Sequence, residues 1–146
     1  MADIHATLAP WAEALLRAIA GLALLPHALQ KLFGFFPESK VPANLTELAA
    51  SLDQWGYRPG KFWAFIVAAT ELIAGPLLAL GLFTRWAALP IFIFLALSAA
   101  AHGKRDGWFW TVHGAEYPLV WAAIALFFFI NGGGPLSLDA WLGFGG

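Results

Sequence analysis

Residues 11–36 read WAEALLRAIAGLALLPHALQKLFGFF, an apolar run whose ionisable side chains are Glu13, Arg17, His27 and Lys31. A helix needs about 20 predominantly apolar residues to cross the hydrocarbon core of a bilayer, and this run is long enough. The stretch therefore predicts a membrane-spanning helix, bent at Pro26 because proline disrupts the helical hydrogen bonding.

Three further apolar runs follow, at residues 62–83, 86–101 and 117–130. The run at 62–83 is long enough to span a membrane, whereas the last two need neighbouring residues to complete a span. Continuous apolar runs exclude a β-barrel, in which apolar and polar residues alternate. The sequence thus predicts an all-α membrane protein with four transmembrane helices in one domain, residues 1–146.

The composition of the whole chain supports a membrane protein. Hydrophobic residues make up 60% and charged residues only 12% of the 146 residues, against about 45–50% and about 25% in soluble domains. The eight Trp and thirteen Phe suit aromatic belts at the two membrane interfaces. A net charge of -1 excludes a nucleic-acid partner, and the absence of cysteine removes disulfides and thiolate metal sites.

The connections between these runs predict how the helices are arranged. Only Thr84 and Arg85 separate the second and third spans, which must therefore be antiparallel neighbours. In the first loop, Asn44 and Glu47 have the spacing of a capping box, which predicts a short helix lying at the membrane interface or capping the bundle. Near the C-terminus, Ser137 has the position of a cap for a short terminal turn.

Lysine and arginine placement predicts the orientation. Cytoplasmic loops carry an excess of these residues. The opposite side, with both termini and the short loop, has only Arg85, whereas loops one and three together hold Lys40, Arg58, Lys61, Lys104 and Arg105. We therefore expect loops one and three in the cytoplasm and both termini on the outer side of the membrane.

A few charges are kept within the predicted spans. At about 100° per residue, the ionisable side chains of the first span fall within an arc of about 80° on one helix face. Glu71 lies near the middle of the second span, with Arg17 or His27 as its expected partner. A charge at mid-membrane costs at least about 2.5–3.5 kcal/mol, so such residues face the bundle interior and pair. Two interpretations stay open: a salt bridge that sets helix register, or a proton-accepting carboxylate in a redox or transport site.

A second polar set is predicted at the end of the bundle formed by loops one and three: His27, Lys31, His102, His113 and Glu116. No two of the histidines have helical i, i+3 or i, i+4 spacing, so we expect neither a metal nor haem. Taken singly, each is a plain helix-end or loop residue. Taken together, they suit a quinone, whose carbonyl oxygens need hydrogen-bond donors and whose reduction needs a proton source.

Six short motifs follow one another along the chain, at residues 16–21 (LRAIAG), 27–34 (HALQKLFG), 71–75 (ELIAG), 81–85 (GLFTR), 114–119 (GAEYPL) and 132–139 (GGGPLSLD). In sequence and in order they resemble the DoxX family. Ala28 and Pro76 stand where the family often has glycine, and neither departure touches an ionisable position. The resemblance implies a four-helix bacterial inner-membrane protein linked to redox complexes, similar to the membrane subunit of thiosulfate:quinone oxidoreductase.

These observations lead to one main functional hypothesis, a quinone-binding membrane subunit of an oxidoreductase. Glu71 and Arg17 are its expected catalytic residues, Glu71 exchanging the proton. His27, Lys31, His102 and Glu116 are the residues expected to bind the quinone. The electrons would come from the quinone or from a protein partner in the complex, because the chain has no evident redox group of its own.

The alternative hypothesis is a non-catalytic structural or assembly subunit that docks a redox partner. A third hypothesis is a small-solute transporter. Four helices are few for a transporter unless the chain dimerises. The sequence leaves the formation of a homo-oligomer open.

Overall fold

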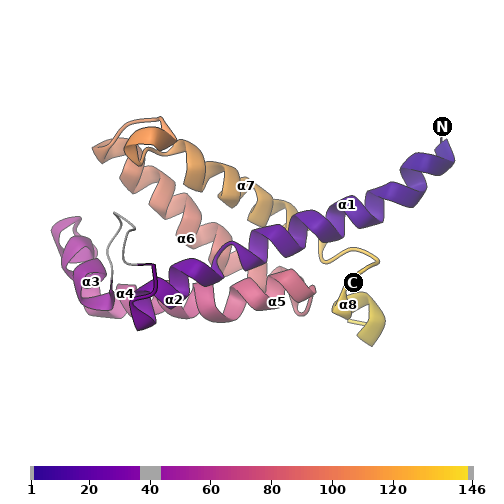
Figure 1. Ribbon diagram of the computed structural model, residues 1–146, viewed down its shortest axis with the longest axis horizontal. Helices are drawn as coiled ribbons and strands as arrows, with labels where there is room; N and C mark the ends of the chain where they lie inside the picture. The colour runs from indigo at the N-terminus through magenta and orange to yellow at the C-terminus, as the bar shows by residue number, and fades with distance from the viewer. Residues whose placement is uncertain (1, 37–43, 145–146) are drawn as a thin grey trace.

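The computed structural model describes residues 2–36 and 44–144, and every regular element among them is helical (Figure 1). The elements are α1 (Ala2–Leu22), α2 (Leu25–Phe33), α3 (Leu45–Gln54), α4 (Gly60–Ala69), the π-helical turn η1 (Thr70–Ala74), α5 (Gly75–Leu80), α6 (Thr84–Arg105), the 3-10 turn η2 (Trp110–Val112), α7 (Glu116–Asn131) and α8 (Leu138–Leu142). The prediction of an all-α protein is confirmed for this part of the chain.

The helices form four antiparallel rods (Figure 1): α1 with α2, then α4 with η1 and α5, then α6, then α7. Both described ends of the chain lie at the same end of the bundle as the turn between α5 and α6, as the sequence predicts. Within the described residues, three helical segments are long and apolar enough to cross a membrane: Asp3–Phe33, Gly60–Leu80 and Thr84–Arg105. The fourth rod, α7, is also apolar but has only 16 residues.

The first rod breaks between α1 and α2, just before Pro26. Leu24 occupies the N-cap position of α2 without a side-chain cap, and Pro26 stands in the first turn of α2, where a missing N–H group costs no helical hydrogen bond. The helix is thus interrupted just before the proline at which the sequence predicts a bend.

Small residues bring α1 and α5 into close contact. A Cβ atom added to Gly21 would lie 2.3 Å from the backbone oxygen of Gly75 and 2.5 Å from the backbone nitrogen of Ala79. Membrane helices commonly associate through such small residues, because packing rather than water exclusion holds them together. Leu78 and Phe128, both fully buried, belong to the core that joins the rods.

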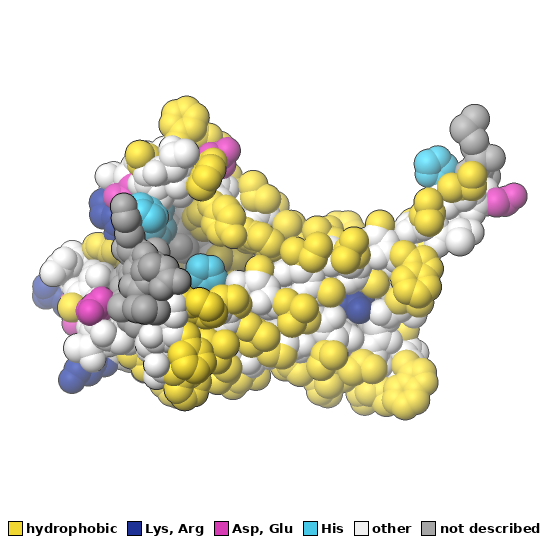
Figure 2. All heavy atoms as spheres, viewed as in Figure 1, with side chains coloured by type: hydrophobic (Ala, Val, Ile, Leu, Met, Phe, Trp, Pro, Cys, Tyr) yellow, Lys and Arg dark blue, Asp and Glu magenta, His cyan; other side chains and the backbone are white. Residues whose placement is uncertain are grey.

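Large apolar side chains point outward along the rods. Figure 2 shows hydrophobic side chains over most of the band between the two ends of the molecule, whereas most of the charged side chains in view gather at the ends. Trp86, for example, is 77% exposed and Phe65 is 62% exposed. Such a surface is unfavourable in water and suits a lipid environment.

The helix predicted in loop one is confirmed as α3. The Glu47 backbone N–H donates to Oδ1 of Asn44 at 2.9 Å, and the Asn44 side-chain amide donates to Oε1 of Glu47 at 3.2 Å. The apolar face of α3, with Leu48 and Leu52, packs against α4 at Ala64. Its place at the membrane interface stays a prediction.

Candidate functional site

Lys31 and Glu71 form an ion pair inside the bundle. Lys31 Nζ lies 2.6 Å from both Oε1 and Oε2 of Glu71, and the two side chains are only 12% and 3% exposed. Lys31 comes from α2 and Glu71 from η1, which joins α4 to α5. A π-helical turn is rare and often marks a functional site. The expectation that Arg17 or His27 pairs with Glu71 is therefore wrong.

Arg17 instead binds backbone oxygens at the end of the bundle that holds both termini. Its guanidinium donates to the carbonyl of Ala79 at 3.4 Å, to that of Leu136 at 2.8 Å and to that of Gly133. Along the first rod, Arg17 and Lys31 are separated by 14 residues, about 21 Å at 1.5 Å per residue. The angular positions at 100° per residue place Arg17 and Lys31 on the same side of the rod, but they do not show how far apart the two residues lie along its axis.

Asp139 completes the same polar cluster. Its Oδ1 accepts from the backbone N–H of Phe83 at 2.6 Å, and its Oδ2 accepts from the backbone N–H and the hydroxyl of Thr84 at 2.8 and 2.6 Å. These bonds satisfy N–H groups at the start of α6, which have no partner inside the helix. The Ser137 cap predicted from the sequence is confirmed, because its Oγ accepts from the Ala140 N–H at 3.1 Å. We call Arg17, Thr84, Ser137 and Asp139 the terminal cluster.

His102 lies at the opposite end of the bundle, in the last turn of α6. Its Nδ1 is 3.1 Å from Oδ2 of Asp106. The Arg105 guanidinium stacks over the ring of Trp55 at 4.2 Å from its centre, and its hydrogen bond to Asp106 holds the pKa of that carboxyl below its ordinary value. This group links the end of α6 to the residue that caps α3.

Glu116 and His27 take separate positions. Glu116 Oε2 accepts from the backbone N–H of Trp110 at 3.1 Å, which fixes the loop before α7. His27 is exposed on α2, one turn before Lys31, and His113 is exposed in the loop between α6 and α7. Of the six residues expected in one site, only Lys31 and Glu71 contact each other in the part of the chain that the structure describes. Within the described ranges, no group of three or more His, Asp or Glu residues is placed to hold a metal ion.

Gln30 is a polar residue that the sequence analysis did not single out. It lies next to Lys31, is only 4% exposed, and its Nε2 has no hydrogen-bond partner among the described residues. An unsatisfied buried donor costs about 1–3 kcal/mol, so the fold keeps the Gln30 amide in this position at a cost in stability. The sequence could have indicated this residue, because Gln30 is a single side-chain amide within a long apolar run.

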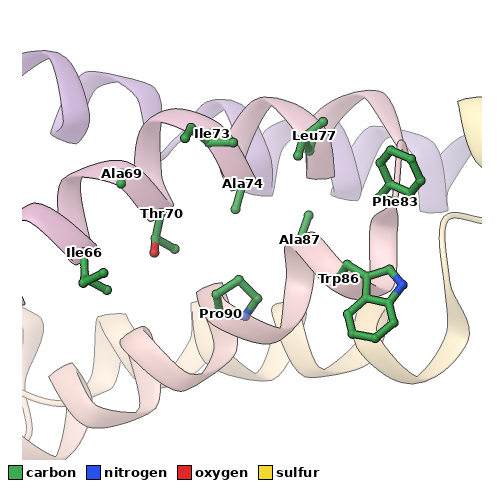
Figure 3. A pocket seen from close by; sticks show the side chains of 10 residues that line it. All are labelled: Ile66, Ala69, Thr70, Ile73, Ala74, Leu77, Phe83, Trp86, Ala87 and Pro90. Atoms are coloured by element: carbon green, nitrogen blue, oxygen red, sulfur yellow. The ribbon is translucent and has the colours of Figure 1, made fainter.

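A groove of about 580 Å³ runs between the second rod and α6 (Figure 3). Its lining consists of Ile66, Ala69, Thr70, Ile73, Ala74, Leu77, Phe83, Trp86, Ala87 and Pro90. Only Thr70 and Trp86 carry polar side-chain atoms, and they lie toward opposite ends of the groove. Glu71 is not part of the lining, but it directly follows Thr70 in η1. The groove and the ion pair therefore share one π-helical turn.

Long apolar helical rods with large apolar side chains on their outer surface define a multi-pass α-helical membrane protein. The DoxX family model matches residues 12–116, most of the chain, and the protein belongs to the DoxX family. The resemblance to the DoxX family is thereby confirmed, whereas the likeness to the membrane subunit of thiosulfate:quinone oxidoreductase stays a prediction. No curated protein and no solved structure matches the chain.

Proposed function

We propose that this DoxX protein is a quinone-binding membrane subunit of a redox complex. The observation that carries the proposal is the buried Lys31–Glu71 pair. The Glu71 side chain is only 3% exposed, and it lies in the π-helical turn η1, which also borders an apolar groove. Keeping an ion pair in the interior of a membrane bundle is costly, and such pairs commonly serve proton or ligand chemistry.

The groove suits an apolar ligand with a polar head. Its aliphatic and aromatic lining would accept an isoprenoid tail, while the Thr70 hydroxyl and the Trp86 indole N–H are donors suited to carbonyl oxygens. A bound quinone would supply the electron chemistry, because the chain contains no cysteine.

The ion pair has a separate task in this proposal. Glu71 holds or releases a proton one residue from Thr70, and Lys31 stabilises its charged form. The buried donor of Gln30, beside Lys31, adds a second polar group on α2. Arg17, His102 and Glu116 position helices and loops around the site rather than contact the ligand.

The membrane arrangement belongs to the same proposal. We place α7 as the fourth span, because it runs antiparallel beside α6 (Figure 1). The lysine and arginine bias between the two ends supports an orientation in a bacterial inner membrane with both termini on the periplasmic side.

The test combines extraction with titration. Lipophilic molecules extracted from the purified protein are identified by mass spectrometry, and a short-chain prenyl benzoquinone is then titrated while tryptophan fluorescence and melting temperature are followed. Ala69→Phe fills the groove and Glu71→Gln removes the charged carboxylate. We expect each variant to weaken quinone affinity by about tenfold or more, equivalent to at least about 1.4 kcal/mol.

The matched control for the groove is Ala123→Phe, which adds the same side chain at an exposed position of α7. It should bind quinone like the wild type. The proposal fails if the wild type carries no quinone and added quinone changes neither fluorescence nor melting temperature.

A structural or assembly subunit is the second candidate. The terminal cluster supports it, because Arg17 directs its donors to backbone carbonyls of two other segments and so fixes their packing. This candidate predicts that Arg17→Leu and Glu71→Gln lower stability without any quinone effect. It would also be favoured if affinity purification recovered a redox protein and no small molecule.

A further inference from the structure

The loop between α6 and α7 displays an apolar surface. Its large side chains are each more than half exposed: Trp108 55%, Phe109 65%, Trp110 63% and Val112 55%. We call these four residues the aromatic turn. Figure 2 shows hydrophobic side chains gathered over this loop, with charged side chains nearby. A contiguous exposed apolar patch usually marks a surface that something else covers.

Backbone hydrogen bonds hold the aromatic turn in a defined conformation. The Gly114 N–H donates to the Phe109 carbonyl at 2.9 Å, the Ala115 N–H to the Gly107 carbonyl at 3.0 Å and the Glu116 N–H to the Trp108 carbonyl at 2.9 Å. A Cβ atom at Gly114 would lie 2.4 Å from the backbone carbon of Trp108, so glycine is needed for this close packing. The backbone therefore holds the apolar side chains outward in a fixed arrangement.

The level of the turn along the bundle follows from two contacts between α6 and α7. A Cβ atom at Gly103 would lie 3.2 Å from Cβ of Ala115, and one at Gly132 would lie 3.5 Å from Nε of Arg85. Helix α7 thus runs beside α6 from Arg85 to Gly103, 18 residue steps or about 27 Å. That length is close to the roughly 30 Å thickness of the hydrocarbon core, so the aromatic turn begins just beyond its edge.

We propose that the aromatic turn inserts into the boundary between headgroups and acyl chains of the adjacent leaflet. Indole rings are favoured in this zone because they combine an apolar face with one N–H donor. Helix α7, at 16 residues, is about 24 Å long and shorter than the hydrocarbon core. The aromatic turn ends four residues before Glu116, and it extends the apolar surface of α7 at the helix's N-terminal end.

A neighbouring lysine favours lipid over a protein partner. Lys104 is exposed in the last turn of α6, four residues before Trp108, and a lysine at this level can extend its amine to lipid phosphates while its stem stays in the apolar layer. The proposal is independent of quinone binding, because none of the groove residues belongs to the aromatic turn.

Because the chain has no cysteine, a single cysteine can be labelled without removing a native one. Val112→Cys carries an environment-sensitive fluorophore in vesicles of phosphatidylcholine with phosphatidylglycerol. Leu97→Cys, exposed in the middle of α6, is the lipid reference. Asp3→Cys is the water reference, because the first turns of α1 project beyond the other helices (Figure 1).

We expect lipids with a spin label near the headgroup to quench the Val112→Cys label about threefold more than the Asp3→Cys label, with aqueous iodide quenching it correspondingly less. Thr111→Cys, in the same turn, should behave similarly and replaces Val112→Cys if that variant folds poorly. The proposal is overturned if both labels are quenched by iodide as strongly as the Asp3→Cys label. That result would identify the aromatic turn as a water-facing surface for a soluble protein.

Discussion

Replacing Lys31 by Met should expose the energetic role of the buried ion pair. The substitution keeps a long apolar stem but removes the ammonium group that lies 2.6 Å from both oxygens of Glu71. The carboxylate, 3% exposed, is then left without this partner. Breaking a buried pair by removing one partner costs about 3–5 kcal/mol, and the cost of a lone charge at mid-membrane, about 2.5–3.5 kcal/mol, is similar.

The loss should be visible as a lower melting temperature. For a chain of this size, 1 kcal/mol corresponds to about 2–4 °C, so the variant should melt roughly 10 °C below the wild type. The assay heats the detergent-purified protein and measures by size-exclusion chromatography the fraction that stays monodisperse. Unfolding with sodium dodecyl sulfate in mixed micelles gives an independent free-energy difference.

A double variant distinguishes a lost pair from a lost side chain. Lys31→Met with Glu71→Leu removes both charges and should return to within about 1 kcal/mol of the wild type, because replacing a whole buried pair by apolar residues is often neutral. Lys61→Met, at an exposed lysine of α4, is the matched control and should leave stability unchanged. Our reasoning is refuted if Lys31→Met behaves like this control, or if the double variant is less stable than either single variant.

Three further variants test the packing and the unpaired donor. Gly21→Ala should cost several kcal/mol, because the new methyl would lie 2.3 Å from the oxygen of Gly75 and would force α1 away from α5; thermal melting measures the loss. Asp139→Asn should cost about 2–3 kcal/mol, because an amide N–H₂ then faces donors of Phe83 and Thr84, and detergent unfolding measures it. Gln30→Met should stabilise the ligand-free protein by about 1 kcal/mol, since it removes a buried donor without a partner, and the same unfolding assay applies.

The first two of these variants have a matched comparison, and the third has an outcome that would contradict it. Gly103→Ala adds a methyl with only one neighbour, a side chain at 3.2 Å, and should cost much less than Gly21→Ala. Asp3→Asn, exposed in the first turn of α1, should leave stability nearly unchanged. A large loss of stability in Gln30→Met would show that this amide is a structural residue with a partner in the folded protein.

The sequence predicted the local features of the fold well because their causes are local. The capping box at Asn44, the helix break just before Pro26 and the cap at Ser137 each depend on residues within four positions of one another. The apolar runs likewise predicted the helical rods. The apolar run at residues 117–130 also predicted the bounds of α7 to within one residue, but the neighbouring residues do not lengthen this helix beyond its 16 residues.

The candidate site was only partly predictable. The sequence indicated that Glu71 is buried and needs a basic partner, but it offered Arg17 and His27 rather than Lys31. Partner choice depends on the register between α1, α2 and α5, which the close approach of Gly21 and Gly75 sets.

By itself, the sequence determined that this DoxX protein is helical, lies in a membrane and keeps a polar stripe on its first rod. These properties follow from hydrophobicity and periodicity, which are read along one chain segment at a time. Only the tertiary structure showed that the residues of this stripe have different partners. Arg17 belongs to the terminal cluster, whereas Lys31 pairs with Glu71. The physical reason is that a helical face is defined by angle alone, whereas a salt bridge requires two side chains at the same level of neighbouring helices within about 4 Å.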